Sequence, residues 1–408
     1  MNLWPTFLLA TTHVITMNAI TPLIPLYAVS RGATPALVGV VVSSASALPL
    51  VLGVWAGLAS DVLGSRRMAV MGSLGFVAAT ALLATARSIP LLVTAAALSG
   101  MAHNLMVVAN QTAVASASRA GRHDRDFGLF SFWISVGQLL GPLLGGFLAD
   151  RYSLQTALYA CAAAGLVPFA MALSVSANPP AQGDQALRPL RPDHAYRAAW
   201  SLTRRQDVRF VLWIAFLVIF AWSIRASFLP IYLESVGLTK AEIGIVFSCI
   251  GGGATLVRPM IGALSVRFGR RRLLLGAVAL ATLTLAGIPL LRGFWPLVAV
   301  TLVGGVGWGV TQPMTISLIA GAVSAQERGV ALSLRMTSNR LAELLSPIVF
   351  GATAARAGLG GAFTLAAGAM TVGLIVVARA FRTTALAADP HAAAPSPGRP
   401  ATAGARRP

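Results

Sequence analysis

The sequence predicts an all-α membrane protein with twelve transmembrane helices, arranged as two pseudo-symmetric bundles of six. The first observation is composition: of 408 residues, 56% are hydrophobic and 11% are charged, and the mean hydropathy is +0.76. Such a chain has too few charged groups to cover a water-soluble globule of this size. The second is a series of apolar runs of roughly 20 residues, the length that crosses a bilayer as a helix. The third is an internal repeat at a distance of 205 residues, which indicates a duplication.

The repeat is clearest in a short polar link between two apolar runs. Residues 57–67 read GLASDVLGSRR, and residues 262–272 read GALSVRFGRRR. Both glycines and the basic cluster are in register, whereas Asp61 of the first copy is replaced by Val266 in the second. Glycines in a short link permit a tight turn between two helices, and arginines hold such a turn at the anionic inner leaflet.

The apolar runs give the predicted helices in chain order. The first six lie at 5–29, 36–58, 68–86, 89–115, 127–149 and 156–175, and the second six lie at 211–233, 240–264, 273–291, 296–322, 330–353 and 361–380. The expected segments are an N-terminal bundle at 1–176, a polar cytoplasmic linker at 177–209, a C-terminal bundle at 210–381 and a disordered cytoplasmic tail at 382–408. The first run is longer than the apolar region of a cleavable signal, so we expect a retained spanning helix.

The basic residues predict the orientation in the membrane. With a cytoplasmic N-terminus, 21 of the 31 basic residues fall in inner segments and six in outer loops, the bias of a protein with both termini inside. We therefore expect a multi-pass protein of the plasma membrane, the inner membrane of a bacterial cell. The remaining four basic residues lie inside predicted helices: Arg225, Arg258, Arg335 and Arg340. The net charge of +19 does not indicate a nucleic-acid partner, because the basic residues lie between apolar runs.

Both copies of the link resemble the loop signature of the major facilitator superfamily, Gly-x-x-x-Asp-x-x-Gly followed by basic residues. The resemblance covers nearly the whole chain, and it implies the fold of that superfamily and secondary transport. It implies gating roles for Gly57, Asp61, Gly64, Arg66, Arg67, Gly262, Gly269 and Arg271.

In this superfamily the position of Asp61 is thought to latch the two halves when the inner side is closed. The expected partners are the N-terminal end of the helix at 330–353 and the arginines at 119, 122 and 125. Val62 and Ser65 stand where basic residues are usual. The departure implies a weaker first latch.

The predicted helix at 127–149 carries a run of glycines with one proline: Gly128, Gly137, Gly141, Pro142, Gly145 and Gly146. The pattern resembles in full the signature of the antiporters of the same superfamily, chiefly exporters of drugs and metabolites. It implies proton-coupled export of a small organic molecule by rocker-switch alternating access. The structural alternative is that small residues at four-residue spacing allow close helix packing and that the proline adds a kink.

Charged residues within helices predict the proton-coupling sites. Glu343 is the carboxylate that we place near mid-membrane, and Asp61 is a second candidate. A polar stripe at intervals of four, four and three residues contains Arg335, Asn339, Glu343 and Ser346. In a functional role, Glu343 either binds the transported proton or is held ionised by an arginine that it releases when substrate binds. The structural alternative is a static pair with Arg340 or Arg225 that holds helices together.

Polar residues in the other predicted helices outline a substrate cavity. The candidates are His13, Asn18, His103, Asn104, Asn110, Gln111, Gln138, Arg225, Gln312, Asn339 and Arg340. Four of them form a strip along the helix at 89–115, because the second pair follows the first by seven residues. That helix lacks the arginine often found there in the antiporters. Inter-helix hydrogen bonding is the alternative role for an intramembrane histidine, and packing is the alternative for Trp222 and Trp308.

Several classes of function lack support. The sequence contains no nucleotide-binding loop, metal-ligand cluster or Ser/His/Asp set, so we expect no enzymatic activity, cofactor or metal, and transport driven by a gradient. The expected partners of a monomeric chain are a small-molecule substrate, protons and the lipid bilayer. Two alternatives stay open: an uptake symporter for an organic anion or sugar, which the arginine surplus favours, and a membrane sensor without transport activity.

Overall fold

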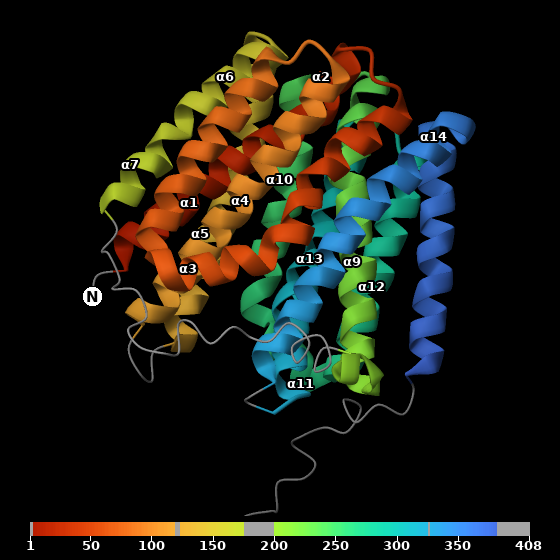
Figure 1. Cartoon of the computed structure of the whole chain (residues 1–408). Helices are drawn as coiled ribbons and strands as arrows, with labels where there is room; N and C mark the ends of the chain where they lie inside the picture. Colours follow the sequence, from red (N-terminus) through yellow and green to blue (C-terminus); the bar gives the residue numbers. More distant parts are fainter. Residues whose placement is uncertain (1–2, 119–122, 175–199, 325–326, 382–408) are drawn as a thin grey trace, which may run out of the picture.

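The computed structural model describes residues 3–118, 123–174, 200–324 and 327–381, and every regular element in these ranges is a helix (Figure 1). The predicted tail at 382–408 and residues 177–199 of the predicted linker lie outside the described residues. Residues 200–204 are helical and the next helix begins at Gln206. Helical structure therefore begins before the predicted boundary at 210.

The helices of the two halves follow each other in a similar order. The first half contains α1 (Trp4–Ile20), α2 (Leu23–Ser30), α3 (Pro35–Thr85), α4 (Ile89–Ala117), α5 (His123–Arg151), α6 (Leu154–Ala164) and α7 (Leu166–Ser174). The second half contains α9 (Gln206–Ser235), α10 (Lys240–Val257), η1 (Arg258–Met260), α11 (Ile261–Phe268), α12 (Arg270–Gly287), η2 (Ile288–Leu290), α13 (Phe294–Gly321) and α14 (Arg328–Ala380). Eleven stretches of the described residues are long and apolar enough to cross a membrane, against the twelve predicted.

The difference in number lies in α14, which is 53 residues long. A straight helix of that length would extend about 80 Å, far beyond the roughly 30 Å apolar core of a bilayer. Gly358 interrupts α14 with φ 70° and ψ 169°, between the predicted spans at 330–353 and 361–380. Phe350 and Phe363, on either side of Gly358, have ring centroids 4.8 Å apart. The chain therefore doubles back at this glycine. Figure 1 shows α14 turning back on itself.

The backbone at the turns repeats between the two halves. Gly64 and Gly269, which are equivalent positions of the two polar links, both have a φ of 78°. Gly32 and Gly237, another pair separated by the repeat distance, have φ values of 83° and 91°. Residues with a Cβ atom rarely adopt this left-handed region. Glycine at these positions is therefore required by the turns themselves.

Three predicted helices are interrupted near prolines. The predicted helix at 5–29 is divided between α1 and α2 at Pro22, and the helix at 156–175 is divided three residues before Pro168. The helix at 240–264 is interrupted at Pro259, which lies in η1. Proline has no backbone N–H to donate, and its ring clashes with the carbonyl four residues earlier. The apolar pattern is continuous through all three breaks, so hydropathy alone merges the pieces.

The most extensive contacts between the halves are those of α3 with α14 and of α5 with α10. In the first pair, Gly39 lies against the carbonyl group of Pro347, and Gly351 lies against the carbonyl group of Pro35. The absence of side chains at these glycines allows the backbones to approach closely. Ser46 and Glu343 lie on the helices of the first contact, and Gln138 lies on α5 of the second.

Candidate functional site

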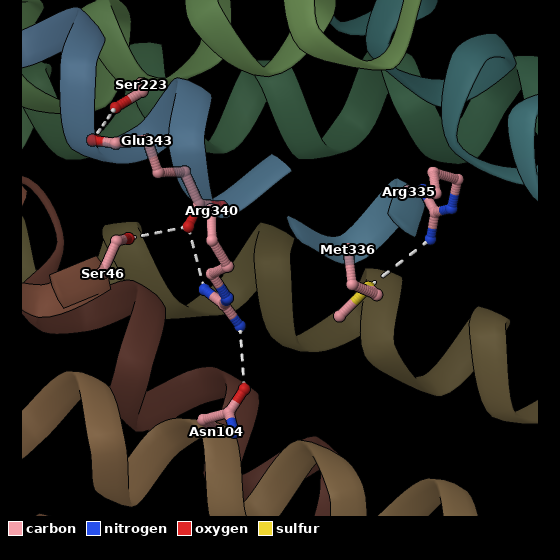
Figure 2. Close-up of polar contacts among 7 residues, drawn as sticks. All are labelled: Ser46, Asn104, Ser223, Arg335, Met336, Arg340 and Glu343. Carbon is pink, nitrogen blue, oxygen red and sulfur yellow. Dashed lines mark hydrogen bonds and ion pairs between the residues drawn. The ribbon is translucent and has the colours of Figure 1, made fainter. Parts of the chain in front are cut away.

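A chain of polar contacts joins the two halves near the middle of their helices (Figure 2). Arg340 Nη1 donates to Glu343 Oε2 at 2.8 Å, and Ser46 Oγ donates to the same oxygen at 2.8 Å. Arg340 Nη2 donates to Asn104 Oδ1 at 3.2 Å. Ser46 belongs to α3 and Asn104 to α4. One ion pair on α14 therefore binds two helices of the other half.

The ion pair is partly open, whereas its partners in the first half are enclosed. The side chains of Arg340 and Glu343 are 17% and 25% exposed, while Ser46 and Asn104 are buried. Hydrogen bonds that involve an ionised partner are roughly twice as strong as neutral ones. The arrangement provides a partly exposed carboxylate whose charge holds the guanidinium in place.

Arg225 is not the partner of Glu343. Its Nη2 donates to the carbonyl oxygen of Ala281 at 2.7 Å and to Thr284 Oγ1 at 2.9 Å. Both acceptors lie on α12, within the same half, and Arg225 is 3% exposed. A Cβ added at Gly304 would lie 3.0 Å from Arg225 Nη1, so this glycine leaves room for the guanidinium. Arg225 links α9 to α12 and is enclosed in the second half.

The two other intramembrane arginines also have protein partners. Arg258, on η1, donates to the carbonyl oxygen of Ser131 at 3.0 Å and to the hydroxyl of Ser135. Both serines lie on α5, so this arginine contacts the opposite half. Arg335 donates to Gln312 Oε1 at 3.5 Å, within the second half. Protein groups thus provide acceptors for the surplus positive charge.

Two predicted cavity histidines form a pair between α1 and α4. His13 Nε2 and His103 Nδ1 are 2.9 Å apart, with 24° between the ring planes. His13 is 1% exposed, and its Nδ1 has no partner among the residues that the structure describes. Asn104, which follows His103 in sequence, accepts the hydrogen bond from Arg340. A titratable pair therefore lies beside the contact between the halves.

A narrow cavity lies between the two halves, with open space for about one water molecule. Its lining residues are Asn18, Thr21, Gln138, Pro142, Trp222, Phe247, Ile250, Gly251 and Trp308. The rings of Trp222 and Trp308 stack with centroids 4.7 Å apart and planes at 22°. Asn18 and Gln138 are cavity residues that the sequence predicted. Phe247 was missed, because an aromatic residue in an apolar run has no signal that separates lining from packing.

The other predicted cavity residues have different surroundings. Asn110 and Asn339 are buried, and their side-chain oxygens have no hydrogen-bond partner within the described part of the chain. Gln111 is exposed, and Gln312 accepts the hydrogen bond from Arg335. The strip expected along α4 is therefore divided: His103 and its neighbour face the interior contacts, whereas the strip's last residue faces outward.

The glycines of α5 lie against two different helices. A Cβ added at Gly141 would be 2.6 Å from the carbonyl oxygen of Ile15 in α1, and one at Gly146 would be 2.5 Å from that of Lys240 in α10. The other motif glycines that lie against α1 are Gly137 and Gly145. Gly128 has open space around it. Close packing thus accounts for most of the motif, and at Gly146 that packing is between the halves.

One end of the α5–α10 contact also carries charge. Asp150 Oδ1 accepts a hydrogen bond from the backbone N–H of Lys240 at 3.1 Å, and Lys240 Nζ lies 3.4 Å from Glu234 Oε1. Lys240 begins α10, whereas the polar link at 262–272 follows the other end of that helix, so this contact lies away from the second link. Asp150 was placed at a helix end by the sequence and was not predicted to be functional.

For most residues of the predicted latch, the structure does not describe the side-chain surroundings. Gly57, Asp61 and position 125 are among the residues whose side-chain surroundings are not described, and positions 119 and 122 lie outside the described residues. The latch between Asp61 and these arginines therefore stays a prediction.

The other residues of the links are described. Arg66 is half-buried and Arg67 is exposed, and the surroundings of Gly262 are open. Arg271 Nη2 donates to the carbonyl oxygen of Ala378 at 2.8 Å. Since Ala378 lies in the last segment of α14, this arginine fastens two helices of the same half.

Comparison with known families agrees with this arrangement. The profile described as Major Facilitator Superfamily matches residues 6–291 and again residues 211–407. The chain belongs to the major facilitator superfamily. Membership and the apolar helices make it a multi-pass protein of the inner membrane.

Two curated relatives of this member of the superfamily are named for drug resistance. Quinolone resistance protein NorA of Staphylococcus aureus is 20% identical over 353 residues, which cover 82% of this chain and 85% of the relative. Multidrug resistance protein MdtG of Citrobacter koseri is 25% identical over 320 residues, which cover 77% of each chain.

Solved structures share the fold at low sequence identity. The nucleoside transporter NupG, in a mutant form, has a TM-score of 0.80 at 16% identity and covers 93% of this chain and 100% of its own. A bacterial homologue of the lysosomal transporter Spinster, in an inward-facing and unoccupied conformation, has a TM-score of 0.74 at 15% identity, with 93% and 95% covered. These neighbours show the fold, and membership of the major facilitator superfamily makes this chain a transporter and not an enzyme.

Proposed function

We propose that this transporter exports a small organic molecule in exchange for protons, by rocking of its two halves about the central cavity. The main observation in support is that Glu343 and Asn104, from opposite halves, both accept hydrogen bonds from the guanidinium of Arg340. Protonation of Glu343 removes the negative charge that holds Arg340. The guanidinium then needs new acceptors, and the contact between the halves weakens. Proton binding and movement of the halves are coupled in this way.

The proposal includes a topology. Counting the segments of α14 before and after Gly358 separately gives twelve spans, with both termini in the cytoplasm and the basic links on the inner side. The chain works as a monomer, because the two halves within it form the cavity.

Export, rather than uptake, is supported by the glycine motif of α5 and by the resistance names of both relatives. The arginine surplus favoured uptake of an organic anion, since unpaired intramembrane arginines need counter-ions. Arg225 and Arg258 have protein acceptors instead. Because these arginines already have acceptors, they give less support to uptake of an organic anion.

The polar links act as the inner gate in this proposal. Gly64 and Gly269 give both links the same turn geometry, and Asp61 supplies a carboxylate in the first link. We expect Asp61→Asn to slow turnover while the substrate Kd stays unchanged, because the variant alters the gate and leaves the cavity intact. Equal turnover of both proteins in proteoliposomes would assign Asp61 to turn formation alone.

Proteoliposomes that contain a pH-sensitive dye test the coupling. We choose norfloxacin as the probe because the name of one relative refers to quinolones. With the membrane potential clamped by potassium and valinomycin, movement of norfloxacin into the liposomes should move protons outward, and protein-free liposomes provide the control. Protein-dependent norfloxacin flux without proton movement would contradict the coupling.

A further inference from the structure

The central cavity has a composition that restricts its substrate. It is lined by residues of both halves, among them Asn18 of α1, Gln138 of α5, Trp222 of α9 and Trp308 of α13. A molecule bound there touches both halves at once, as a transported substrate must. The present opening has space for about one water molecule, so a substrate enters when the halves move apart.

One wall of the cavity is aromatic and flat. The rings of Trp222 and Trp308 are nearly parallel, 4.7 Å between centroids and 22° between planes. Both side chains are half-buried and both line the cavity, so the stacked pair presents an edge or a face to it. Phe247 adds a third ring to the lining. Aromatic groups stack on such surfaces in offset or edge-to-face geometry, which selects a planar ring system.

The first half contributes an unsatisfied hydrogen-bond acceptor to the lining. Gln138 Oε1 is buried, and no described residue donates a hydrogen bond to it. Pro142, one turn later in the lining of α5, has no N–H to offer. A buried amide oxygen without a donor carries a desolvation cost that a ligand donor removes. The position therefore selects a ligand with an N–H or O–H group.

Charge is absent from the lining residues that the structure describes. Glu343, which the sequence places near mid-membrane, is engaged by Arg340 and Ser46, and Arg258 is engaged by α5. The indole faces attract cations through their quadrupoles. That attraction is smaller than the cost of removing a fixed charge from water without a counter-ion. The cavity favours a molecule with no net charge.

We propose, on the basis of the transport function above, that the substrate is a planar aromatic molecule without net charge that packs against the stacked pair of Trp222 and Trp308 and donates a hydrogen bond to Gln138 Oε1. The location of Gln138 connects binding to movement. It lies between Gly137 and Gly141, which pack on α1, and a Cβ at Gly251 of α10 would lie 3.1 Å from its backbone carbonyl carbon. A ligand held by this side chain contacts α5 where it meets both halves.

Three probes of one size separate the features: 2-quinolone, which is neutral and has an N–H donor; 1-methyl-2-quinolone, which lacks the donor; and 1-methylquinolinium, which is permanently cationic. Binding to the purified full-length protein is measured by thermal stabilisation and equilibrium dialysis. We expect 2-quinolone to bind at least about tenfold more tightly than its methylated analogue, the loss expected for one buried hydrogen bond. The cation should bind most weakly.

Single substitutions test whether Gln138 and Trp308 cause these differences in probe binding. Gln138→Leu should remove the difference between the two neutral probes, because neither then finds an acceptor. Trp308→Leu should weaken all three probes together. Trp295→Leu is the matched control: Trp295 lies on the same helix, is 76% exposed and does not line the cavity, so probe binding should not change. Folding of each variant is checked by its melting temperature without probe.

Two results would overturn the inference: 1-methylquinolinium binding as tightly as 2-quinolone, or a preference for the N–H probe that persists in a folded Gln138→Leu variant. Different results would contradict the proposed function. Binding of 2-quinolone with the expected variant effects, but without proton-coupled flux, would contradict coupled export and leave the ligand class standing. Coupled flux of 1-methylquinolinium without binding of the neutral probes would contradict the ligand class and leave coupled export standing.

Discussion

Arg340 of α14 donates a hydrogen bond to Asn104 of α4 at 3.2 Å, between the two halves of the transporter and near the middle of its helices. The same guanidinium holds Glu343. An unpaired charge at this depth costs at least about 2.5 kcal/mol, so Arg340 must find new acceptors whenever the halves separate or Glu343 is neutralised. This link between one proton and one interface is the basis of the first prediction.

Glu343→Gln should lower proton-driven exchange at least about tenfold, an effect of about 1.4 kcal/mol. Glutamine can accept the hydrogen bonds of Arg340 and Ser46 but cannot bind a transported proton. Exchange of labelled for unlabelled substrate, which needs no net proton movement, should persist. Ser46→Ala serves as the control, because it removes a hydrogen bond to Glu343 and keeps the carboxylate. Proton-driven exchange at the wild-type rate in Glu343→Gln would assign the coupling to another group.

The His13–His103 pair is the other titratable group beside Arg340. A proton on the pair places a second positive charge close to the guanidinium and disfavours the contact between Arg340 and Asn104. We expect His103→Gln to change the shape of the dependence of transport rate on pH, because the variant removes one of the two titratable rings of the pair. The measurement is the initial rate at a series of symmetric pH values, with His194→Gln, outside the predicted helices, as the control. If the pH profiles of wild type and His103→Gln superimpose, the histidine pair contributes hydrogen bonding between helices and does not affect the pH dependence of transport.

Gly146→Ala should reduce transport, whereas Gly128→Ala should not. A methyl group at Gly146 would meet the carbonyl oxygen of Lys240 at 2.5 Å, and one at Gly128 meets open space. Both substitutions raise helix propensity by the same amount, about 1 kcal/mol, so the difference between them reports packing between the halves. Overpacking costs roughly 1–3 kcal/mol, and transport rates in proteoliposomes should differ at least about fivefold. Equal rates would mean that α5 and α10 separate easily at this point.

Arg225→Met should lower the melting temperature and leave the substrate Kd within about twofold of wild type, a change of about 0.4 kcal/mol. The guanidinium donates to Ala281 and Thr284 inside the second half, and methionine cannot replace those hydrogen bonds. Equilibrium dialysis with 2-quinolone gives the Kd, and thermal unfolding gives the stability. A large loss of affinity for 2-quinolone at an unchanged melting temperature would indicate that Arg225 contacts the substrate.

The architecture was predictable because it depends on features that repeat along the sequence. Apolar runs of membrane length gave the helices, and the repeated links placed glycine at both turns, where the structure has a φ of 78° at Gly64 and at Gly269. The breaks at Pro22 and Pro259 were missed, since a proline within an apolar run can be accommodated as a kink or end the helix. Sequence alone does not decide which of these occurs.

The partners of the charged residues were less predictable. The sequence offered Arg340 and Arg225 as partners of Glu343, and the choice between them depends on the rotation of α9, which no pattern encodes. Ser46 was missed because one hydroxyl in a run of small residues has no directional signal. The His13–His103 pair joins residues 90 positions apart, so each appeared in the sequence as an isolated histidine.

The direction of flux under an imposed pH gradient tests the central claim most directly. Inverted membrane vesicles, whose interior corresponds to the cell exterior, are loaded with acid and mixed with norfloxacin. The account predicts protein-dependent accumulation of norfloxacin inside these vesicles, which an uncoupler abolishes, and loss of preloaded norfloxacin from right-side-out vesicles placed in acid. Accumulation in right-side-out vesicles driven by external acid would contradict export and identify an uptake symporter.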